Sequence, residues 1–170
     1  MSVYKYEDNL ESKRLRTRFL TMDDVSQWTQ FLADKEAVKY FPKMDFPTAE
    51  ARSNFWMEKQ LGRYANKHYG LQALYNKNTN EFIGQCGLMT QIVNDVTELE
   101  VGYHILPKYW GQGYAPEAAK LFLDYGFKNQ LSDSIISIIH VDNKNSQRVA
   151  EKNGLQREKQ THWNGLDIFI

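Results

Sequence analysis

The sequence predicts a single-domain α/β fold with a mixed, mostly antiparallel sheet and helices on both of its faces. Over residues 98–105 apolar and polar side chains alternate with the two-residue period of a strand. After a turn that contains two glycines, apolar residues recur over 118–125 at i, i+3, i+4 and i+7, which is the spacing of a helix. The 170 residues, 42% of them hydrophobic, suffice for one domain with a substantial core.

The first third of the chain reads as a strand followed by two helices. Residues 13–20 alternate apolar and basic side chains, as expected of a strand with one polar face. Thr21 precedes an acidic residue, Asp24, by three positions and then an apolar stripe, which predicts a capped helix start. Thr48 opens a second helix in the same way, and we expect it to end near residues 65–66.

The rest of the chain alternates strands with two further helices. We expect strands at residues 68–75, 81–91, 98–105, 134–141, 155–161 and 166–170, and helices from residue 114 and at residues 144–152. Asn153 and Gly154 form a typical helix end. The resulting order is β-α-α-β-β-β-α-β-α-β-β, with residues 1–12 as a loosely attached leader and residues 13–170 as the domain.

Composition excludes several classes of function. Lys plus Arg and Asp plus Glu number 21 each, so no excess charge calls for nucleic acid or an anionic membrane. The single cysteine, Cys86, excludes an internal disulfide and reads as a buried structural thiol rather than a nucleophile. The four histidines have no metal-ligand spacing, so no metal is expected. With no apparent signal peptide or membrane span, we expect a cytoplasmic protein.

The turn between the strand at 98–105 and the following helix suits a phosphate group. Gly111 and Gly113 allow an anion to approach the backbone, and the helix start leaves N–H groups without partners. Pro116 and Glu117 both favour a first helical turn at this point. The alternative is an ordinary tight turn. The spacing matches neither a P-loop nor a dinucleotide-binding glycine motif, which disfavours a nucleotide fold of those kinds.

The run Pro-Lys-Tyr-Trp-Gly-Gln-Gly-Tyr-Ala-Pro-Glu-Ala resembles the GCN5-related N-acetyltransferases (GNAT), and within them the ribosomal-protein N-terminal acetyltransferases. Gly111 and Gly113 fill the two small positions of the family signature, whereas Lys108 stands where Gln or Arg is usual. The resemblance implies the GNAT fold and acetyl-CoA as co-substrate. It also implies cofactor contacts from the strand end and the loop, namely His104, Ile105, Leu106, Lys108, Trp110, Gly111, Gln112, Gly113, Tyr114 and Ala115.

A second stretch, residues 142–155, resembles the Asn-x-x-Ser…Glu-Lys-x-Gly motif of the same family. By that resemblance Asn143 would bind the pantetheine arm and Ser146 would lie near the thioester sulfur. Many members carry a tyrosine acid four residues before the glycine, where this chain has Ala150, which makes Ser146 the candidate acid. The alternative is that Asn143 and Ser146 only cap a helix.

Acetyl transfer to an amine requires a base, a polarised carbonyl and alignment of the two reactants, and it needs no covalent enzyme intermediate. The resemblance places Glu100 as the base, with Glu98 on the same strand face as its substitute; a solvated surface carboxylate is the alternative. The backbone N–H of Ile105 or Leu106 is the candidate donor to the thioester carbonyl.

The acceptor is expected in loops that line a groove in this family. Tyr40, Phe41 and Trp163, together with Glu98, are the candidate acceptor-binding residues, although each aromatic could equally serve ordinary packing. The sequence therefore predicts an N-acetyltransferase that acts, as a monomer or homodimer, on a protein N-terminal α-amine or a small-molecule amine. The alternative is a CoA-binding regulatory module without catalysis.

Overall fold

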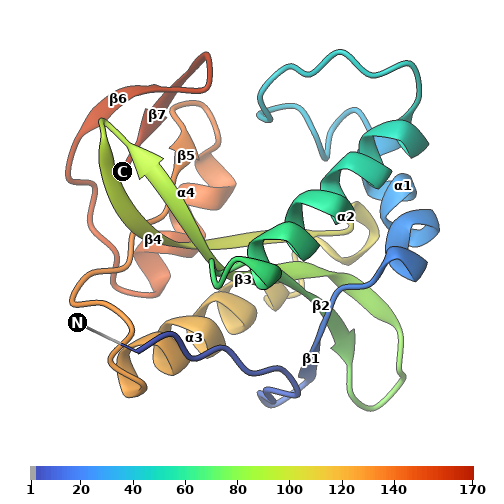
Figure 1. The fold of residues 1–170 in the computed structure, drawn as a ribbon, viewed down its shortest axis with the longest axis horizontal. Helices are drawn as coiled ribbons and strands as arrows, with labels where there is room; N and C mark the ends of the chain where they lie inside the picture. The colour runs from blue at the N-terminus through green and yellow to red at the C-terminus, as the bar shows by residue number, and fades with distance from the viewer. Residues whose placement is uncertain (1–2) are drawn as a thin grey trace.

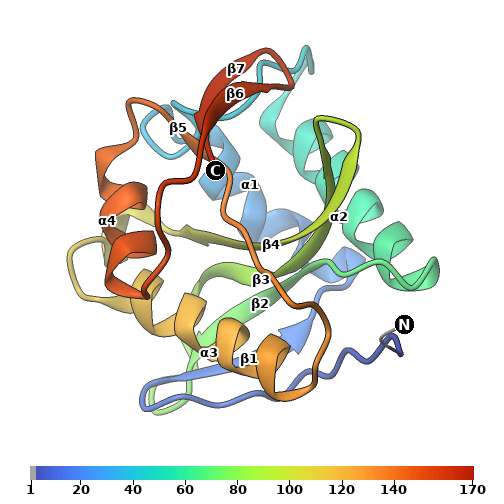
Figure 2. The same cartoon turned by 90° about the vertical axis from the view of Figure 1, so that its left-hand side faces the viewer.

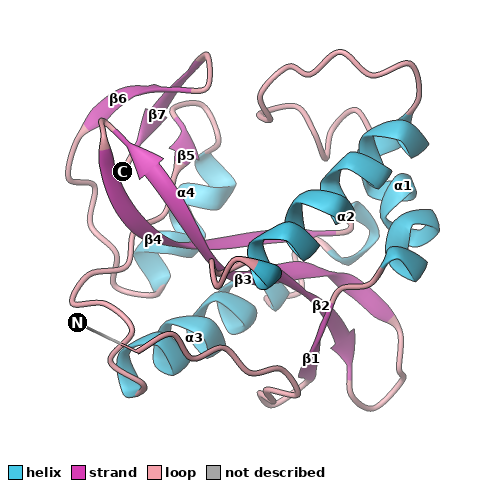
Figure 3. Cartoon of the chain, viewed as in Figure 1, coloured by secondary structure: helices cyan, strands magenta, loops and turns pink. Residues whose placement is uncertain are grey.

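The computed structural model describes residues 3–170 and contains two sheets and four α-helices (Figures 1 and 3). The first sheet has the order β1 (Leu15–Phe19), β2 (Leu71–Asn76), β3 (Phe82–Val93), β4 (Val96–Ile105), all antiparallel. The second has the order β5 (Ile139–His140), β7 (Leu166–Phe169), β6 (Gln160–Trp163). The helices are α1 (Val25–Ala33), α2 (Ala49–Ala65), α3 (Tyr114–Lys128) and α4 (Lys144–Lys152).

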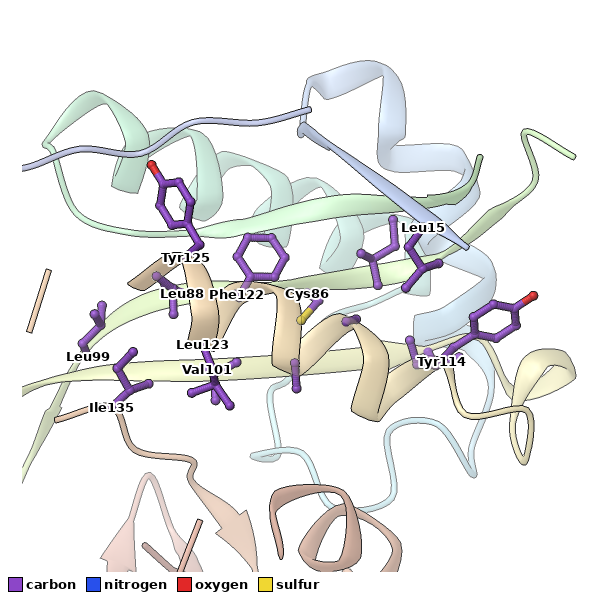
Figure 4. Close-up of a cluster of buried hydrophobic side chains, with 14 of the residues drawn as sticks. Leu15, Cys86, Leu88, Leu99, Val101, Tyr114, Phe122, Leu123, Tyr125 and Ile135 are labelled. Carbon is purple, nitrogen blue, oxygen red and sulfur yellow. The ribbon is translucent and has the colours of Figure 1, made fainter. Parts of the chain in front are cut away.

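The two faces of the first sheet bury separate apolar clusters. On one face α3 packs Phe122 and Leu123 against Leu88 and Val101 of the sheet (Figure 4). On the other face α1 and α2 cover a cluster that contains Trp28 and Met57, among others. Burial of these side chains is the main favourable term in folding. The predicted α/β fold with helices on both faces is confirmed.

Helix capping follows the sequence prediction. The Thr21 hydroxyl and the Asp24 carboxylate form a capping box at a short 3₁₀ turn, Met22–Asp24, that leads into α1. Arg18 on β1 holds the same carboxylate through two hydrogen bonds of 2.9 and 2.6 Å. The Thr48 hydroxyl accepts a hydrogen bond from the N–H of Ala51 at the start of α2. Each cap satisfies donors that the first helical turn leaves free.

Two predicted strands are shorter than expected. Residues 134–141 yield only β5, because the segment leaves β4 after a single parallel bridge between Glu100 and Ile136. Two residues later the N–H of Ile138 donates to the Glu100 carboxylate at 3.1 Å instead of continuing a ladder. Residues 155–161 likewise yield only β6, which begins at Gln160. The apolar run at residues 134–141 does not reveal that the Glu100 side chain accepts one of its backbone N–H groups, so the sequence predicts too long a strand.

The expected loose attachment of the first twelve residues does not hold for residues 3–12, which run along the sheet and α3 (Figure 1). The Tyr6 hydroxyl donates to the carbonyl of Gly70 at 2.5 Å and accepts from the N–H of Leu88 at 3.2 Å. A Cβ on Gly87 would lie 2.7 Å from the Tyr6 hydroxyl, so only glycine fits beside it. The segment therefore belongs to the fold even though it forms no helix or strand.

Tyr6→Phe should lower the free energy of unfolding by about 1–3 kcal/mol, because it leaves a buried backbone donor and acceptor without their partner. Tyr4→Phe is the matched control: Tyr4 only contacts the Tyr69 ring, at 4.9 Å, and we expect a change within about 0.5 kcal/mol. Chemical denaturation of the two variants measures the difference. Equal effects of the two substitutions would contradict the anchoring role of Tyr6.

Candidate active site

The last residues of β4 present backbone groups to the gap that opens where β5 diverges from β4. Ile136 exchanges hydrogen bonds of 2.9 Å with Val101 and Leu99, after which β5 diverges from β4. In an antiparallel ladder the hydrogen-bonding direction alternates along the strand, so Ile105 turns its N–H to the same side as Val101, towards the gap. The N–H of Leu106 instead donates to Ile83 at 2.9 Å. Of the two amides considered as carbonyl donors, Leu106 is therefore engaged within the sheet.

The loop after β4 leaves the start of α3 open. Gly111 and Gly113 have φ angles of 76° and 79°, values that favour glycine, and a Cβ on Gly111 would meet nothing within 4 Å. Gly113 is the N-cap of α3 and supplies no side-chain cap. The N–H groups of Tyr114 and Ala115 lie in this first turn, where donors lack intrahelical partners. The geometry suits an anion at this helix end.

Arg14, which directly precedes β1, fixes this loop, and sequence reasoning missed it. Its guanidinium donates to the carbonyl of Gln112 at 2.9 Å and to the Glu117 carboxylate at 2.7 Å, and it lies 4.2 Å from the centre of the Tyr114 ring. Because Glu117 offsets its charge, Arg14 acts here mainly by holding the loop against the first turn of α3. No sequence signal identifies it, because about a hundred residues separate it from the loop and only the sheet order brings the two together.

The other predicted cofactor residues of the loop have diverse surroundings. The Trp110 indole donates to the carbonyl of Ile105 at 2.7 Å and so ties the loop to the strand end. The Lys108 ammonium is exposed and lies 5.1 Å from the centre of the Tyr109 ring. The Tyr114 side chain is buried in the core, where its hydroxyl accepts from Asn76 at 3.2 Å. Only backbone atoms of Tyr114 are therefore available to a ligand.

The N-terminus of α4 lies beside the end of β4. Asn143 caps the helix by accepting a hydrogen bond from the N–H of Ser146 at 3.2 Å. The Ser146 hydroxyl donates to the Tyr103 hydroxyl at 3.1 Å, and Tyr103 donates to the Ser146 carbonyl at 2.8 Å. Burial raises the pKa of Tyr103 to about 12, so its hydroxyl stays protonated at neutral pH. Sequence reasoning found Ser146 but missed Tyr103, which is indistinguishable from any other apolar position of the strand.

Glu100 is a buried carboxylate on the opposite face of β4. It is 6% exposed and accepts hydrogen bonds from the Gln91 side chain at 3.0 Å and from the N–H of Ile138 at 3.1 Å. Burial raises its pKa to about 7, and the two hydrogen bonds and the charge of Arg63 only partly oppose that rise. A carboxylate with this pKa exchanges its proton near neutral pH, as a general base must.

His104 lies on the Glu100 side of the strand rather than on the cofactor side. Its ring is enclosed by an aromatic box of four rings whose centres lie 5.1–6.4 Å from its own: Trp28, Phe31, Phe41 and Trp56. Burial lowers the pKa of His104 to about 4, so the ring is neutral at pH 7. The His104 side chain therefore faces away from the edge proposed for the cofactor, which leaves only its backbone for such a contact, and its surroundings agree with a pocket wall.

The predicted acceptor residues are only partly brought together. Phe41 belongs to the aromatic box, whereas Tyr40 points to β5 and lies 4.9 Å from the centre of the His140 ring. Glu98 shares the strand face of Glu100 and is half-buried. Trp163 lies at the end of β6, and within residues 3–170 it makes no ring contact with the box.

Two further features lie outside this site. A cavity of about 570 Å³ between α3, α4 and the C-terminal strand is lined by none of the predicted site residues. The thiol of Cys86 is buried in the core, and burial raises its pKa, which agrees with a structural role. Within residues 3–170, no three His, Cys, Asp or Glu side chains gather to hold a metal ion, and no helix has the length and apolar character needed to cross a membrane.

Comparison with known proteins relates the chain to acetyltransferases. A family model of the acetyltransferase (GNAT) domain matches residues 14–156. The uncharacterized protein YkkB of Bacillus subtilis is 34% identical over 155 residues, which cover 88% of this chain and 87% of that protein. The uncharacterized N-acetyltransferase p20 of Bacillus licheniformis is 28% identical over 154 residues, which cover 89% and 84%.

Solved structures show the same fold. An acetyltransferase of the GNAT family from Bacillus anthracis superposes with a TM-score of 0.76 at 28% identity, covering 94% of both chains. The ribosomal L7/L12 α-N-protein acetyltransferase RimL, in complex with coenzyme A, also gives a TM-score of 0.76, at 17% identity, covering 96% of this chain and 95% of the other. At that identity the likeness to RimL shows a shared fold alone.

Glu100→Gln should stabilise the protein at high pH only. Because the Glu100 pKa rises from 4.5 to about 7 on folding, the wild type loses stability as the pH increases from 4.5 through 7, whereas the variant has no such group. We expect the variant to gain about 2–3 kcal/mol in unfolding free energy at pH 8 and less than about 1 kcal/mol at pH 5. Denaturation at the two pH values measures this. Glu58→Gln, at an exposed position of α2, is the control; a gain that does not change with pH would contradict the raised pKa.

Proposed function

The chain belongs to the GNAT acetyltransferase family, and from this premise we propose that it acetylates a primary amine by direct attack on acetyl-CoA within a ternary complex. Membership makes it an acetyl-CoA-dependent N-acetyltransferase. The observation that carries the proposed mechanism is Glu100, a buried carboxylate with a pKa of about 7. It lies on β4, the strand whose outer edge faces the gap towards β5. Burying such a group costs stability, and a pKa near neutrality is the property that a general base requires.

Acetyl-CoA would supply an acetyl group activated as a thioester. Three features of the chain fit it: the uncapped start of α3 with Gly111 and Gly113 suits the phosphates, Arg14 fixes that loop through the carbonyl of Gln112, and the β4 edge at Ile105 can donate to a carbonyl. Figure 2 shows this loop and the start of α3 on the side of the molecule where α4 lies. Asn153, the residue that caps the end of α4, donates to the carbonyl of Pro116 at 3.2 Å.

Glu100 takes the proton from the ammonium group of the acceptor, so that the neutral amine can attack. Its pKa of about 7 is high enough to bind that proton and low enough to leave the carboxylate ionised above neutral pH. The rate should therefore rise with pH through about 7. Gln91 holds one carboxylate oxygen and the N–H of Ile138 the other, which fixes the orientation of the base.

Ser146 and Tyr103 act at the leaving sulfur. The serine hydroxyl is a weak acid, and its proton is directed to Tyr103 while Tyr103 donates to the Ser146 carbonyl. To protonate the sulfur, the serine hydroxyl would turn to it, and the Tyr103 hydroxyl, which stays protonated, would then donate to the serine oxygen. The thiolate it would protonate is already a fair leaving group, so a modest contribution suffices. The N-cap Asn143 holds Ser146 in place through the N–H of that residue.

The acceptor is proposed to be a protein N-terminal α-amine or a small-molecule amine. Support for the first comes from fold relatives such as RimL, which acts on the α-amine of a ribosomal protein. Support for either comes from the aromatic box around His104, which offers a largely apolar wall further along the same face of β4 as Glu100.

The test is calorimetric titration with acetyl-CoA and, as the competitor class, with ATP, followed by a free-thiol assay over a panel of amines and peptides. We expect binding of acetyl-CoA alone and thiol release with at least one class of amine. Binding of acetyl-CoA without thiol release from any amine would overturn the proposed activity. Absence of binding would show that the Gly111–Gly113 loop is an ordinary turn.

Glu100→Gln should lower kcat by about 10²–10⁴-fold and leave the affinity for acetyl-CoA unchanged, because only proton removal is affected. Glu98→Gln is the matched control and should stay within a few-fold of wild type. A loss in Glu98→Gln alone would move the base to that residue, and no loss in either would assign proton removal to water.

Gln91→Leu removes a hydrogen bond that lowers the Glu100 pKa. The pH at which the rate reaches half of its maximum should therefore be higher in this variant than in the wild type.

Tyr103→Phe and Ser146→Ala should each lower kcat, and the double variant should lose little more than the larger single effect, because the two hydroxyls act as one unit. Steady-state kcat values of the wild type, the two single variants and the double variant complete this double-mutant cycle. Losses that simply multiply would show that the two hydroxyls act independently.

A further inference from the structure

The guanidinium of Arg63, a half-buried residue of α2, has one fully buried nitrogen without a partner. Its Nη1 atom has no solvent exposure and no hydrogen-bond partner, and among residues 3–170 its side chain forms no ion pair. Burial lowers its pKa, which reflects the cost of removing a guanidinium from water. The nearest opposing charge is that of Glu100, whose two oxygens are already held by Gln91 and Ile138.

A second arginine on the same helix is in a similar state. Arg52 also has a buried atom, Nε, without a partner, and its only hydrogen bond is one of 3.4 Å from Nη2 to the carbonyl of Pro42. Its guanidinium carbon lies 5.8 Å from the centre of the Phe41 ring. Burial lowers the pKa of Arg52, and no acidic group of the described chain opposes that change.

These two cations flank the acceptor side of the proposed site. Arg52, Trp56 and Arg63 are spaced by four and seven residues and thus lie on one face of α2. Trp56 is part of the aromatic box around His104, and Arg63 interacts electrostatically with Glu100. The face therefore runs along the wall opposite the strand that carries the proposed base.

A buried donor that has lost water and gained no partner in the protein implies a missing acceptor. Most buried guanidinium groups are paired with carboxylates or phosphates, which match their planar fork. Two arginines on the same face are in this state, so the misfit of a single side chain does not explain it.

We propose that the amine acceptor also carries a carboxylate, which Arg63 binds with support from Arg52 while the amine faces Glu100. This inference rests on the proposed acetyltransferase function and names the class of its acceptor. The same chemistry has two sources, the α-carboxylate of a free amino acid and an acidic side chain near a peptide N-terminus. The experiment separates them.

Two pairs of acceptors test the carboxylate. Alanine against alaninamide isolates the α-carboxylate, and Ser-Asp-Ala-amide against Ser-Asn-Ala-amide isolates an acidic side chain. In the wild type we expect kcat/KM to favour the acidic member of at least one pair by about tenfold or more, the range of a charge-assisted hydrogen bond. Turnover of the neutral members without such preference in either pair would overturn the inference and leave the acetyltransferase function intact.

Arg63→Met should abolish that preference by raising KM for the acidic acceptor about tenfold or more, with KM for its neutral partner unchanged. Arg63→Lys, which keeps the charge without the fork, should restore part of it. Arg16→Met, at an exposed position of β1, is the control with the same change in net charge and should keep the preference. Equal losses of Arg63→Met on acidic and neutral acceptors would contradict the assignment.

Two further measurements exclude a merely structural role. Because Arg63→Met removes a desolvated and unpaired cation, its Tm should equal or exceed that of wild type, and calorimetry should give an unchanged affinity for acetyl-CoA. N-acetylalanine, used as a product probe, should bind the wild type more tightly than N-acetylalaninamide, and Arg63→Met should lose the difference. A lower Tm with equal binding of the two probes would show that Arg63 serves the fold.

Discussion

The alternation along β4, combined with the loss of its outer neighbour after Ile136, is the constraint on which the site depends. While Ile136 pairs with Leu99 and Val101, the strand is an ordinary inner strand of a sheet. Beyond that point its outward backbone groups face a gap, because the next segment has turned its N–H to the Glu100 carboxylate. One side chain thus both opens the cofactor edge and serves as the proposed base on the opposite face.

The same arrangement concentrates poorly solvated polar groups around one strand. Burial raises the pKa of Glu100 and lowers those of His104 and Arg63, so all three lose part of their preferred hydration. The fold compensates with two apolar clusters, one on each face of the sheet, whose burial supplies the driving force. Such concentration of unfavourable burial is typical of functional sites, where stability is given up for reactivity.

Local patterns in the sequence were sufficient for the fold and for the local geometry around the candidate site. The alternation over residues 98–105, the capping residues and the glycine loop each depend on neighbours in the chain, so they were predictable. Arg14 and Tyr103 were not, because their partners are distant in the sequence: Gln112 is 98 residues from Arg14, and Ser146 is 43 residues from Tyr103. The premature end of the strand at residues 134–141 was missed for the same reason, since it depends on a contact with Glu100.

The distribution of charge between β4 and α2 has a consequence for the direction of binding. Glu98 and Glu100 lie on one wall and the cations Arg52 and Arg63 on the other, yet the two sets form no ion pair within the described chain. An acceptor with an amine at one end and an anion at the other would satisfy both walls in only one orientation. That orientation places the amine against β4, on the strand whose far edge offers the N–H of Ile105 to the carbonyl under attack. Recognition of the anion would then position the amine for transfer, because binding energy remote from the reacting atoms is used to align them.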